Sequence, residues 1–170
     1  MYRKTNLSKL LINKMDKEDL GKVDDSKKTA LIHAIERNSE EHISKFLIEK
    51  MNKKDLNKAD SQGKTALMYA LSIYQEGITK LLINKIDEED LNKADKSGNT
   101  PLMYAVICDR IYPLKLLIEK KVNCFQADNE GITPLMYAVN HHKNNMIQLL
   151  VQCESDIMEL KKREAAVKKV

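Results

Sequence analysis

Apolar residues recur along this chain in pairs of short clusters, and the pairs return at nearly even intervals. The first cluster of each pair follows a threonine, with Leu two positions and Ala five positions after it. The four threonines are Thr29, Thr65, Thr100 and Thr133, which are 36, 35 and 33 positions apart. The second cluster, such as "LLI" at Leu81 and at Leu116, begins sixteen residues after the threonine, or seventeen in the first unit. Clusters with this spacing are typical of amphipathic helices, so each unit predicts two short helices.

A turn precedes each pair of predicted helices. Three units open with Asp, two variable residues, Gly, one variable residue and Thr, as in "DSQGKT" from Asp60. An Asp carboxylate can accept backbone N–H bonds within a turn, and Gly tolerates a positive φ. Thr is a good N-cap, and Pro101 and Pro134 follow it at the first helical position, where a missing N–H costs nothing. The pattern therefore predicts a tight turn that leads directly into the first helix.

Two helices this short cannot bury both of their apolar faces alone, so stacking on the neighbouring pair is the natural solution. The pattern resembles the ankyrin repeat, a turn plus two antiparallel helices of about 33 residues with the signature T-P-L-H-x-A. "TPLMYA" at Thr100 and at Thr133 matches every defined position except the histidine, and the match covers roughly nine-tenths of the chain. The resemblance implies an all-α ankyrin-repeat solenoid of stacked helix pairs with β-turn fingers.

We expect a single ankyrin-repeat domain over residues 1–170, made of one N-terminal half-repeat, four full repeats and a C-terminal capping helix. The partial repeat is 1–23, in which "LSKLLINK" looks like a second helix, and the full repeats are 24–59, 60–94, 95–127 and 128–155. Residues 156–170 lack the Gly-x-Thr of a further turn and are expected to form a cap helix, from about 157 to 168, and a basic tail. Terminal repeats are atypical because they shield the end of a stack.

Departures from the family pattern predict local changes. Met68, Met103 and Met136, with Ile32 in the first unit, take the slot of the family's histidine, which implies apolar packing in place of a polar bond. Lys27 stands where Gly is expected, and a positive φ there costs on the order of 1 kcal/mol, so we expect a distorted first turn. The earlier units insert two residues after the second helix, in segments such as "IDEEDL", which predicts part of an extra helical turn.

Composition favours a folded protein, with 42% hydrophobic and 32% charged residues. Residues 1–160 carry 24 basic and 24 acidic side chains, whereas "KKREAAVKKV" at the end carries five basic and one acidic. No apolar run has the length of a membrane span or signal peptide, so we expect a cytoplasmic protein; delivery into a host cell stays open. Cys108, Cys124 and Cys153 form neither an even set nor a CxxC pair, which predicts reduced thiols.

The residue types that catalysis and cofactor binding need do not occur in recognisable patterns. The four histidines are not accompanied by HExxH or CxxC, and the adjacent His141 and His142 would point in different directions on a helix. The turn glycines occur singly rather than in a phosphate-binding GxGxxG. Met-Tyr pairs recur once per unit, which packing explains better than a cofactor site. We therefore expect no catalytic residue, no metal site and no cofactor.

The family resemblance implies that partners contact the turn tips and the exposed side of each first helix. Transferring those slots to this chain predicts a partner-binding strip: Lys64, Ser72, Ile73, Lys96, Asn99, Ile107, Cys108, Ile132, Asn140 and His141. Several members are apolar at positions expected to face water. They favour contact with a partner's hydrophobic side chain, although scattered apolar residues also occur on ordinary surfaces.

The leading functional prediction is a non-enzymatic protein–protein interaction module, an adaptor or scaffold, that binds a protein or peptide on its concave groove and is itself a monomer. One alternative is a regulatory or targeting subunit of an enzyme whose catalytic chain is separate. Another is a nucleic-acid or anionic-surface binder that acts through the basic tail. The sequence favours nucleic acid less, because the body of the chain is neutral and offers no interleaved aromatics for base stacking.

Overall fold

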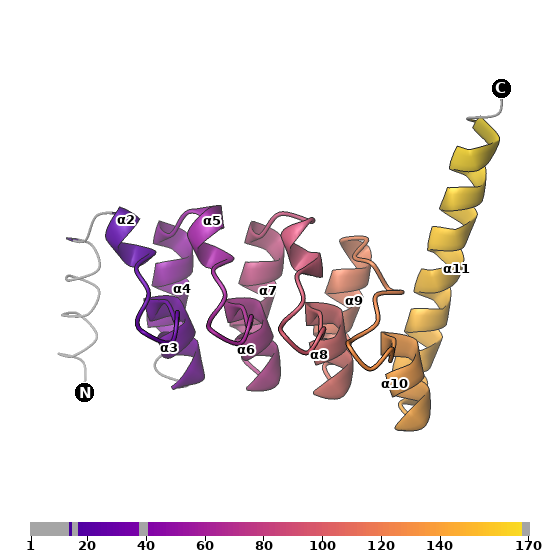
Figure 1. The fold of residues 1–170 in the computed structure, drawn as a ribbon, viewed down its shortest axis with the longest axis horizontal. Coiled ribbons are helices and arrows are strands. Elements are labelled where there is room, and N and C mark those ends of the chain that lie inside the picture. The colour runs from indigo at the N-terminus through magenta and orange to yellow at the C-terminus, as the bar shows by residue number, and fades with distance from the viewer. Residues whose placement is uncertain (1–13, 15–16, 38–40, 168–170) are drawn as a thin grey trace.

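The computed structural model describes residues 14, 17–37 and 41–167 of the 170-residue chain. Its helices lie side by side in an elongated stack (Figure 1). The first helices of successive units are α3 (Ala30–Glu36), α6 (Ala66–Ser72), α8 (Pro101–Ile107) and α10 (Pro134–Asn140). The second helices are α4 (Glu41–Lys50), α7 (Glu76–Lys85), α9 (Ile111–Glu119) and α11 (Asn144–Val167). Each helix contacts its pair mate and the equivalent helix of the next unit, which confirms the all-α solenoid expected from the sequence.

The repeated threonines cap the first helices, as predicted. Each Thr hydroxyl accepts a hydrogen bond from the backbone N–H three residues later, at 3.2 to 3.5 Å. The apolar residues that follow point into the core, and the Leu and Ala of the repeated motif are buried in α3, α6 and α8. Met68 and Met103 are also buried, in agreement with apolar packing in the histidine slot of those units, although Met68 Sδ accepts the Thr65 backbone N–H at 3.4 Å as well. Met136 is 53% exposed, so the expectation is wrong for the last unit, where no following helix of the described chain covers this slot.

The turns have the predicted geometry, and the first one is not distorted. Gly63, Gly98 and Gly131 have φ values of 79°, 86° and 81°. Lys27 adopts the same left-handed conformation with φ 61°, and Asp24 accepts the backbone N–H groups of the turn as its equivalents do. The expectation of a distorted first turn is therefore wrong, because the lysine takes on the strained conformation and the turn keeps its shape.

The segments that carry the two-residue insertions form short helices. These are α2 (Lys17–Leu20), α5 (Lys53–Leu56) and the 3₁₀ helix η1 (Asp90–Asn92). Each places a leucine in the core, namely Leu20, Leu56 and Leu91. The shorter connection after α9, at 120–127, has no helix, so the prediction of an extra turn in the earlier units is confirmed.

The C-terminal end differs from the expected separate cap helix. α11 is a continuous helix of 24 residues that extends past the other second helices (Figure 1). A start near residue 157 was expected because Asp156 resembles the opening of another turn. The sequence there contains no Gly or Pro to end the helix, and Gln152 instead donates a hydrogen bond to the Asp156 carboxylate one turn later, at 2.7 Å. The predicted N-terminal helix "LSKLLINK" lies outside the described residues apart from Lys14.

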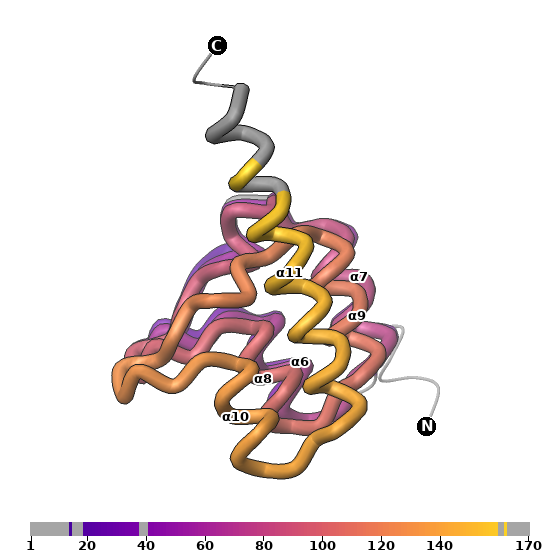
Figure 2. Tube along the Cα trace, turned by 90° about the vertical axis from the view of Figure 1, so that its right-hand side faces the viewer, coloured from indigo at the N-terminus to yellow at the C-terminus, as the bar shows by residue number. Residues whose placement is uncertain are grey.

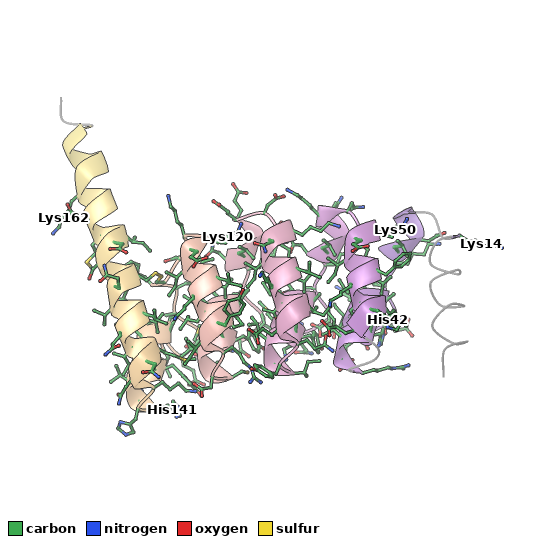
Figure 3. The ribbon with its side chains drawn as sticks, turned by 180° about the vertical axis from the view of Figure 1, so that it is seen from behind. Lys14, His42, Lys50, Lys120, His141 and Lys162 are labelled. Atoms are coloured by element: carbon green, nitrogen blue, oxygen red, sulfur yellow. A yellow bond between two sulfur atoms is a disulfide. The ribbon has the colours of Figure 1, made fainter. Side chains whose placement is uncertain are left out.

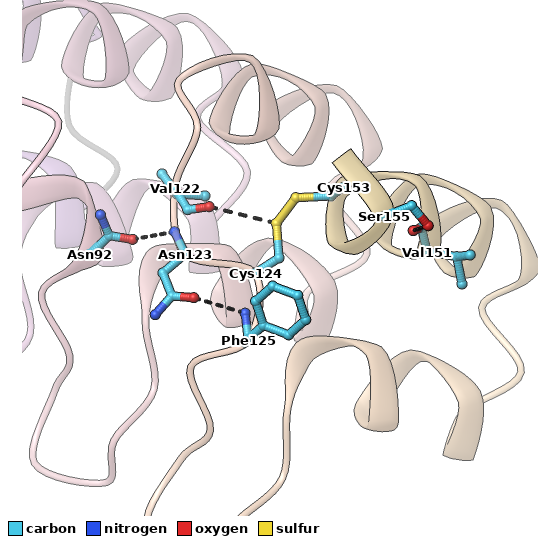
Figure 4. Close-up of a disulfide and its surroundings, with 8 residues drawn as sticks. All are labelled: Asn92, Val122, Asn123, Cys124, Phe125, Val151, Cys153 and Ser155. Carbon is cyan, nitrogen blue, oxygen red and sulfur yellow. Dashed lines mark hydrogen bonds between the residues drawn. A yellow bond between two sulfur atoms is a disulfide. The ribbon is translucent and has the colours of Figure 1, made fainter. Parts of the chain in front are cut away.

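Two of the three cysteines are paired, which corrects the expectation of reduced thiols. Cys124, in the connection after α9, forms a disulfide with Cys153 on α11, and both are buried (Figure 4). Cys108 is free and partly exposed. The paired cysteines are 29 positions apart, so no short spacing motif in the sequence indicates that they pair. They meet only because the last second helix packs beside the connection that precedes its unit.

Candidate partner-binding strip

The turn tips of successive units are joined to one another by backbone hydrogen bonds. Ser61 N–H donates to the Ser26 carbonyl at 2.8 Å, Lys96 N–H to the Gln62 carbonyl at 2.9 Å, and Asn129 N–H to the Ser97 carbonyl at 3.0 Å. The Asn129 side-chain amide adds a bond to the Lys96 carbonyl at 2.8 Å. These bonds fix the spacing between neighbouring tips, so the residues on them form a continuous row.

Three of the four turns are also tied to the first helix that follows them. The aspartate that opens the turn uses one carboxylate oxygen for two backbone N–H groups of the turn, as Asp60 does for Gln62 and Lys64 at 2.8 Å. The other oxygen meets a side chain nine positions later. These pairs are Asp60 with the Tyr69 hydroxyl, Asp95 with the Tyr104 hydroxyl and Asp24 with His33 Nε2, each at 2.7 Å.

The aspartate–tyrosine bond was missed at the sequence level, where the Met-Tyr pairs were explained by packing alone. The constant nine-residue spacing from the turn aspartate to the aromatic residue is the signal that could have revealed it. Burial raises the pKa of Tyr69 to about 12, and its bond to Asp60 acts in the same direction. Burial, followed by the bond to Asp95, raises the pKa of Tyr104 further. Both phenols therefore stay neutral donors at physiological pH.

Cations line the N-terminal part of the strip. Lys64 Nζ lies 4.7 Å from the ring centroid of Tyr69 and 5.0 Å from that of Tyr104, within the range of cation–π attraction. Lys28, the equivalent residue one unit earlier, binds the Glu36 carboxylate at 2.7 and 2.8 Å. Among the described residues, no carboxylate forms an ion pair with Lys64, and its ammonium lies between the two rings.

The strip becomes neutral toward its C-terminal end. Asn99 and Ile132 occupy the slot that holds lysine in the earlier units, and both are partly exposed. Ile107 and Cys108, at the end of α8, are partly exposed as well. In the last unit Tyr137 stacks on His141, with ring centroids 4.2 Å apart. The strip therefore changes from cationic and aromatic to apolar and neutral along the stack.

The predicted strip residues fall at the two kinds of place expected. Lys64, Lys96, Asn99 and Ile132 lie on turn tips, and Ser72, Ile73, Ile107, Cys108, Asn140 and His141 lie at the ends of first helices. Two of these residues are less available for contact with a partner than the sequence suggested. The Ser72 hydroxyl donates to the Met68 carbonyl within its own helix at 2.8 Å, and Ile73 packs against the core. His141 projects from the loop between α10 and α11 (Figure 3).

His141 also lines a cavity of about 530 Å³ between the loops that precede α9 and α11. Its other lining residues include Asp109, His142 and Lys143. The described part of the chain contains no cluster of three or more His, Cys, Asp or Glu residues able to hold a metal ion. Nor do its helices include one that is long and apolar enough to cross a bilayer.

The family model described as ankyrin repeats, in three copies, matches residues 1–92 and 73–160. The chain belongs to the ankyrin repeat family. A comparison with curated proteins gives no match. Ankyrin repeats are in general protein–protein interaction modules. In this ankyrin chain the family's histidine slot is apolar, and in two units the tyrosine at the next position, Tyr69 or Tyr104, donates a hydrogen bond from the first helix to the turn aspartate.

Proposed function

We propose that this chain is a non-enzymatic adaptor or scaffold that binds a protein or peptide along the strip formed by its turn tips and first-helix ends. The observation that carries the proposal is Lys64, whose ammonium lies between two tyrosine rings. A fixed cation without a carboxylate partner is available to an acidic group of a ligand. The rings restrict its position, so little side-chain entropy is lost on binding.

The neutral end of the strip supports an apolar contact in the same ligand. Ile107 and Ile132 come from a helix end and a turn tip, and both retain exposed surface. Partly exposed isoleucine gains by being covered, and such residues often anchor the centre of an interface. We therefore propose a ligand segment with an acidic residue near Lys64 and apolar residues toward the C-terminal end of the strip.

A displayed library of random peptides tests this proposal, because it samples many ligand sequences at once and needs no identified partner. The full chain would be the bait, with two strip variants alongside it: Lys64→Glu, and Ile107→Glu combined with Ile132→Glu. Leu81→Glu is the matched control, because Leu81 is an exposed apolar residue on α7 and is not part of the strip. Circular dichroism and unfolding curves would establish that all four proteins fold.

The proposal expects enrichment of peptides that contain acidic and apolar residues on the wild-type chain and on Leu81→Glu. Lys64→Glu should weaken their binding by about tenfold or more, and the double isoleucine variant should weaken it similarly. Peptides that bind all four proteins equally would place the binding surface elsewhere. Failure to enrich any peptide on the wild-type chain would also count against the strip.

We propose a cytoplasmic location on the sequence expectation, and the disulfide provides a test of it. Disulfides persist in oxidising compartments and are rare in the cytosol, where thiols are kept reduced. Protein isolated from its cell with rapid alkylation should therefore carry alkyl groups on Cys124 and Cys153 if it is cytoplasmic. Recovery of the two residues in the bonded form would argue for an oxidising location.

A further inference from the structure

Each of the two bonded cysteines occupies a position where the earlier units carry a different residue. Four positions before the aspartate that opens a turn, the last connection has Cys124, and the earlier units have a buried leucine, namely Leu20, Leu56 and Leu91. Four positions after the start of the second apolar cluster, α11 has Cys153, and the earlier units have a lysine, namely Lys50, Lys85 and Lys120. The chain therefore departs from its own repeat at two positions far apart in sequence, and the cysteines at these positions are bonded to each other.

The disulfide lies at the edge of the stack where noncovalent contacts join the earlier connections. Lys58 Nζ donates to the Gly21 carbonyl at 2.6 Å. Asn123 N–H donates to the side-chain oxygen of Asn92 at 2.7 Å (Figure 4). α11 continues as a helix over the positions at which the earlier units have such a connection. It is attached at this edge by the disulfide, which begins at the residue after Asn123.

The bond is buried, and it lies in a unit at the end of the described stack. α10 packs beside α8 and α11 beside α9, on one side of the last unit (Figure 2). A unit with a neighbour on one side opens at lower cost than an internal unit. Cys124 is 0% exposed and Cys153 is 5% exposed. A thiol from solution therefore reaches the bond when the last unit opens, so opening and reduction are coupled.

We propose that Cys124 and Cys153 form a reversible redox switch, which keeps the last unit docked when the pair is bonded and releases it when the pair is reduced. The reductant is a small monothiol such as glutathione. Its thiolate attacks the sulfur of Cys153, the less buried of the two, so that a mixed disulfide forms and Cys124 leaves as a thiolate. A second glutathione thiolate attacks the glutathione sulfur of the mixed disulfide, which frees Cys153 and gives oxidised glutathione. Two electrons pass from the two glutathione molecules to the cysteine pair, and their two protons end on the cysteine sulfurs.

The switch regulates the partner-binding strip, and this part of the proposal rests on the proposed function. Ile132, Asn140 and His141 of the strip belong to the last unit. Release of that unit takes these residues out of line with Lys64 and the rest of the strip. The apparent affinity for a ligand falls in proportion to the fraction of molecules in which the complete strip is present. Reduction should therefore weaken ligand binding without any change in the strip residues themselves.

Equilibration of the full chain in mixtures of reduced and oxidised glutathione tests the switch. Alkylation followed by mass measurement gives the bonded fraction, and trypsin cleavage after Lys143 reports release of the last unit. Lys143 suits this purpose because its side chain is 16% exposed and its Nζ lies 3.5 Å from the Ile107 carbonyl. An excess of reduced glutathione should open the bond and speed this cleavage by about tenfold, since proteolysis follows the open population. An excess of oxidised glutathione should reverse both changes.

A peptide enriched on the wild-type chain measures the effect on the strip, and reduction should weaken its binding by about tenfold. Cys124→Leu combined with Cys153→Lys is the matched control, because it gives the last unit the residues that the earlier units have at these positions. Its cleavage and its peptide binding should not respond to glutathione. Cys108→Ser should respond as the wild type does, because Cys108 is unpaired.

The outcomes separate the switch from the proposed function. A bond that stays closed in excess reduced glutathione would overturn the switch, as would an open bond without faster cleavage after Lys143, or a double variant that still responds. Faster cleavage on reduction with unchanged peptide binding would support the switch and contradict the placement of the ligand on the strip. If no peptide is enriched, the proposed function fails, and cleavage after Lys143 alone decides the switch.

Discussion

A single aspartate in each turn accepts backbone N–H groups of that turn, and Asp24, Asp60 and Asp95 also bind a side chain of the helix that follows. Asp60 accepts two backbone N–H groups with one oxygen and the Tyr69 hydroxyl with the other. Asp24 does the same for its turn, with His33 in place of tyrosine. A carboxylate can accept all of these bonds only when it is ionised. Protonation of these residues should therefore loosen the turns before it affects the helices.

Acid should destabilise the protein through these carboxylates. Burial raises the pKa of Asp60, but the bonds from Tyr69 and the turn outweigh it, so the net pKa lies below the ordinary 3.8. The turn bond from Lys28 is the largest influence that lowers the pKa of Asp24. These carboxylates therefore bind protons more readily in the unfolded chain than in the folded one. Their contribution to the free energy of unfolding is present above a pH of about 4 and is lost as the pH falls further. Urea unfolding across this range measures the loss.

Asp60→Asn is the variant that isolates this effect. It should lower the free energy of unfolding at neutral pH by about 1–2 kcal/mol, because an amide accepts these bonds less well than a carboxylate. Its stability should also fall less steeply in acid than that of the wild type. An unchanged acid dependence in Asp60→Asn would show that this carboxylate does not contribute.

Lys27 has a left-handed backbone conformation, and glycine occupies the equivalent position in the other three turns. Its φ of 61° costs a residue with a Cβ atom on the order of 1 kcal/mol. Lys27→Gly should therefore raise the free energy of unfolding by about 0.5–1 kcal/mol, as read from urea curves. Gly98→Ala is the opposite test, since a Cβ there would lie 2.6 Å from the backbone nitrogen of Asn129. It should destabilise by more than Lys27→Gly stabilises, and a neutral result at both positions would contradict the argument.

At the scale of the helix, basic side chains from one unit cap the helices of the unit before it. Arg110 donates to the carbonyls of Leu71 and Ser72 at the end of α6, at 3.1 and 3.4 Å. Lys143 does the same for the end of α8, and Lys85 donates to the last carbonyls of α4. The last carbonyls of a helix lack partners within it and carry its partial negative charge. These contacts therefore stabilise each helix and its attachment to the next unit together.

Arg110→Met tests the capping contact, because methionine keeps an unbranched apolar side chain but lacks the guanidinium group. The variant should lower the free energy of unfolding by about 1–2 kcal/mol, because it removes two hydrogen bonds from a charged group. It also removes the guanidinium that lies 4.4 Å from the Tyr74 ring. Lys115→Met is the control, since Lys115 is exposed on the same helix, α9. Equal losses in the two variants would assign the effect to a general change in charge.

Features that depend on residues near one another in sequence could be predicted. The Thr caps, the turns and the extra helices at α2, α5 and η1 are of this kind, because each is set within a few residues. The contacts of Arg110 and the disulfide could not be found this way, since their partners are joined only by stacking. The repeat pattern was sufficient to predict which residues lie along the strip. It could not predict that Ile73 packs against the core or that Lys64 lies between two tyrosine rings, because these contacts form between units.

At the scale of the whole molecule, the main helix contacts of the described residues join neighbouring units, so stability accumulates along the stack. An end unit has one neighbour instead of two and should open first. The Cys124–Cys153 disulfide lies at such an end and connects α11 to the connection before its unit. It therefore secures the second helix of the last unit to the unit before it.

Reduction should loosen that end selectively. In the chain-entropy description, a bond that closes a loop of this length stabilises by about 3–4 kcal/mol. Adding a reductant, or the change Cys153→Ser, should lower the free energy of unfolding by about that amount. Hydrogen exchange should rise in α10 and α11 while α6 and α7 stay protected. Cys108→Ser should respond to reductant as the wild type does, because Cys108 is unpaired. Identical unfolding curves with and without reductant would mean that the bond between Cys124 and Cys153 does not hold this end of the stack.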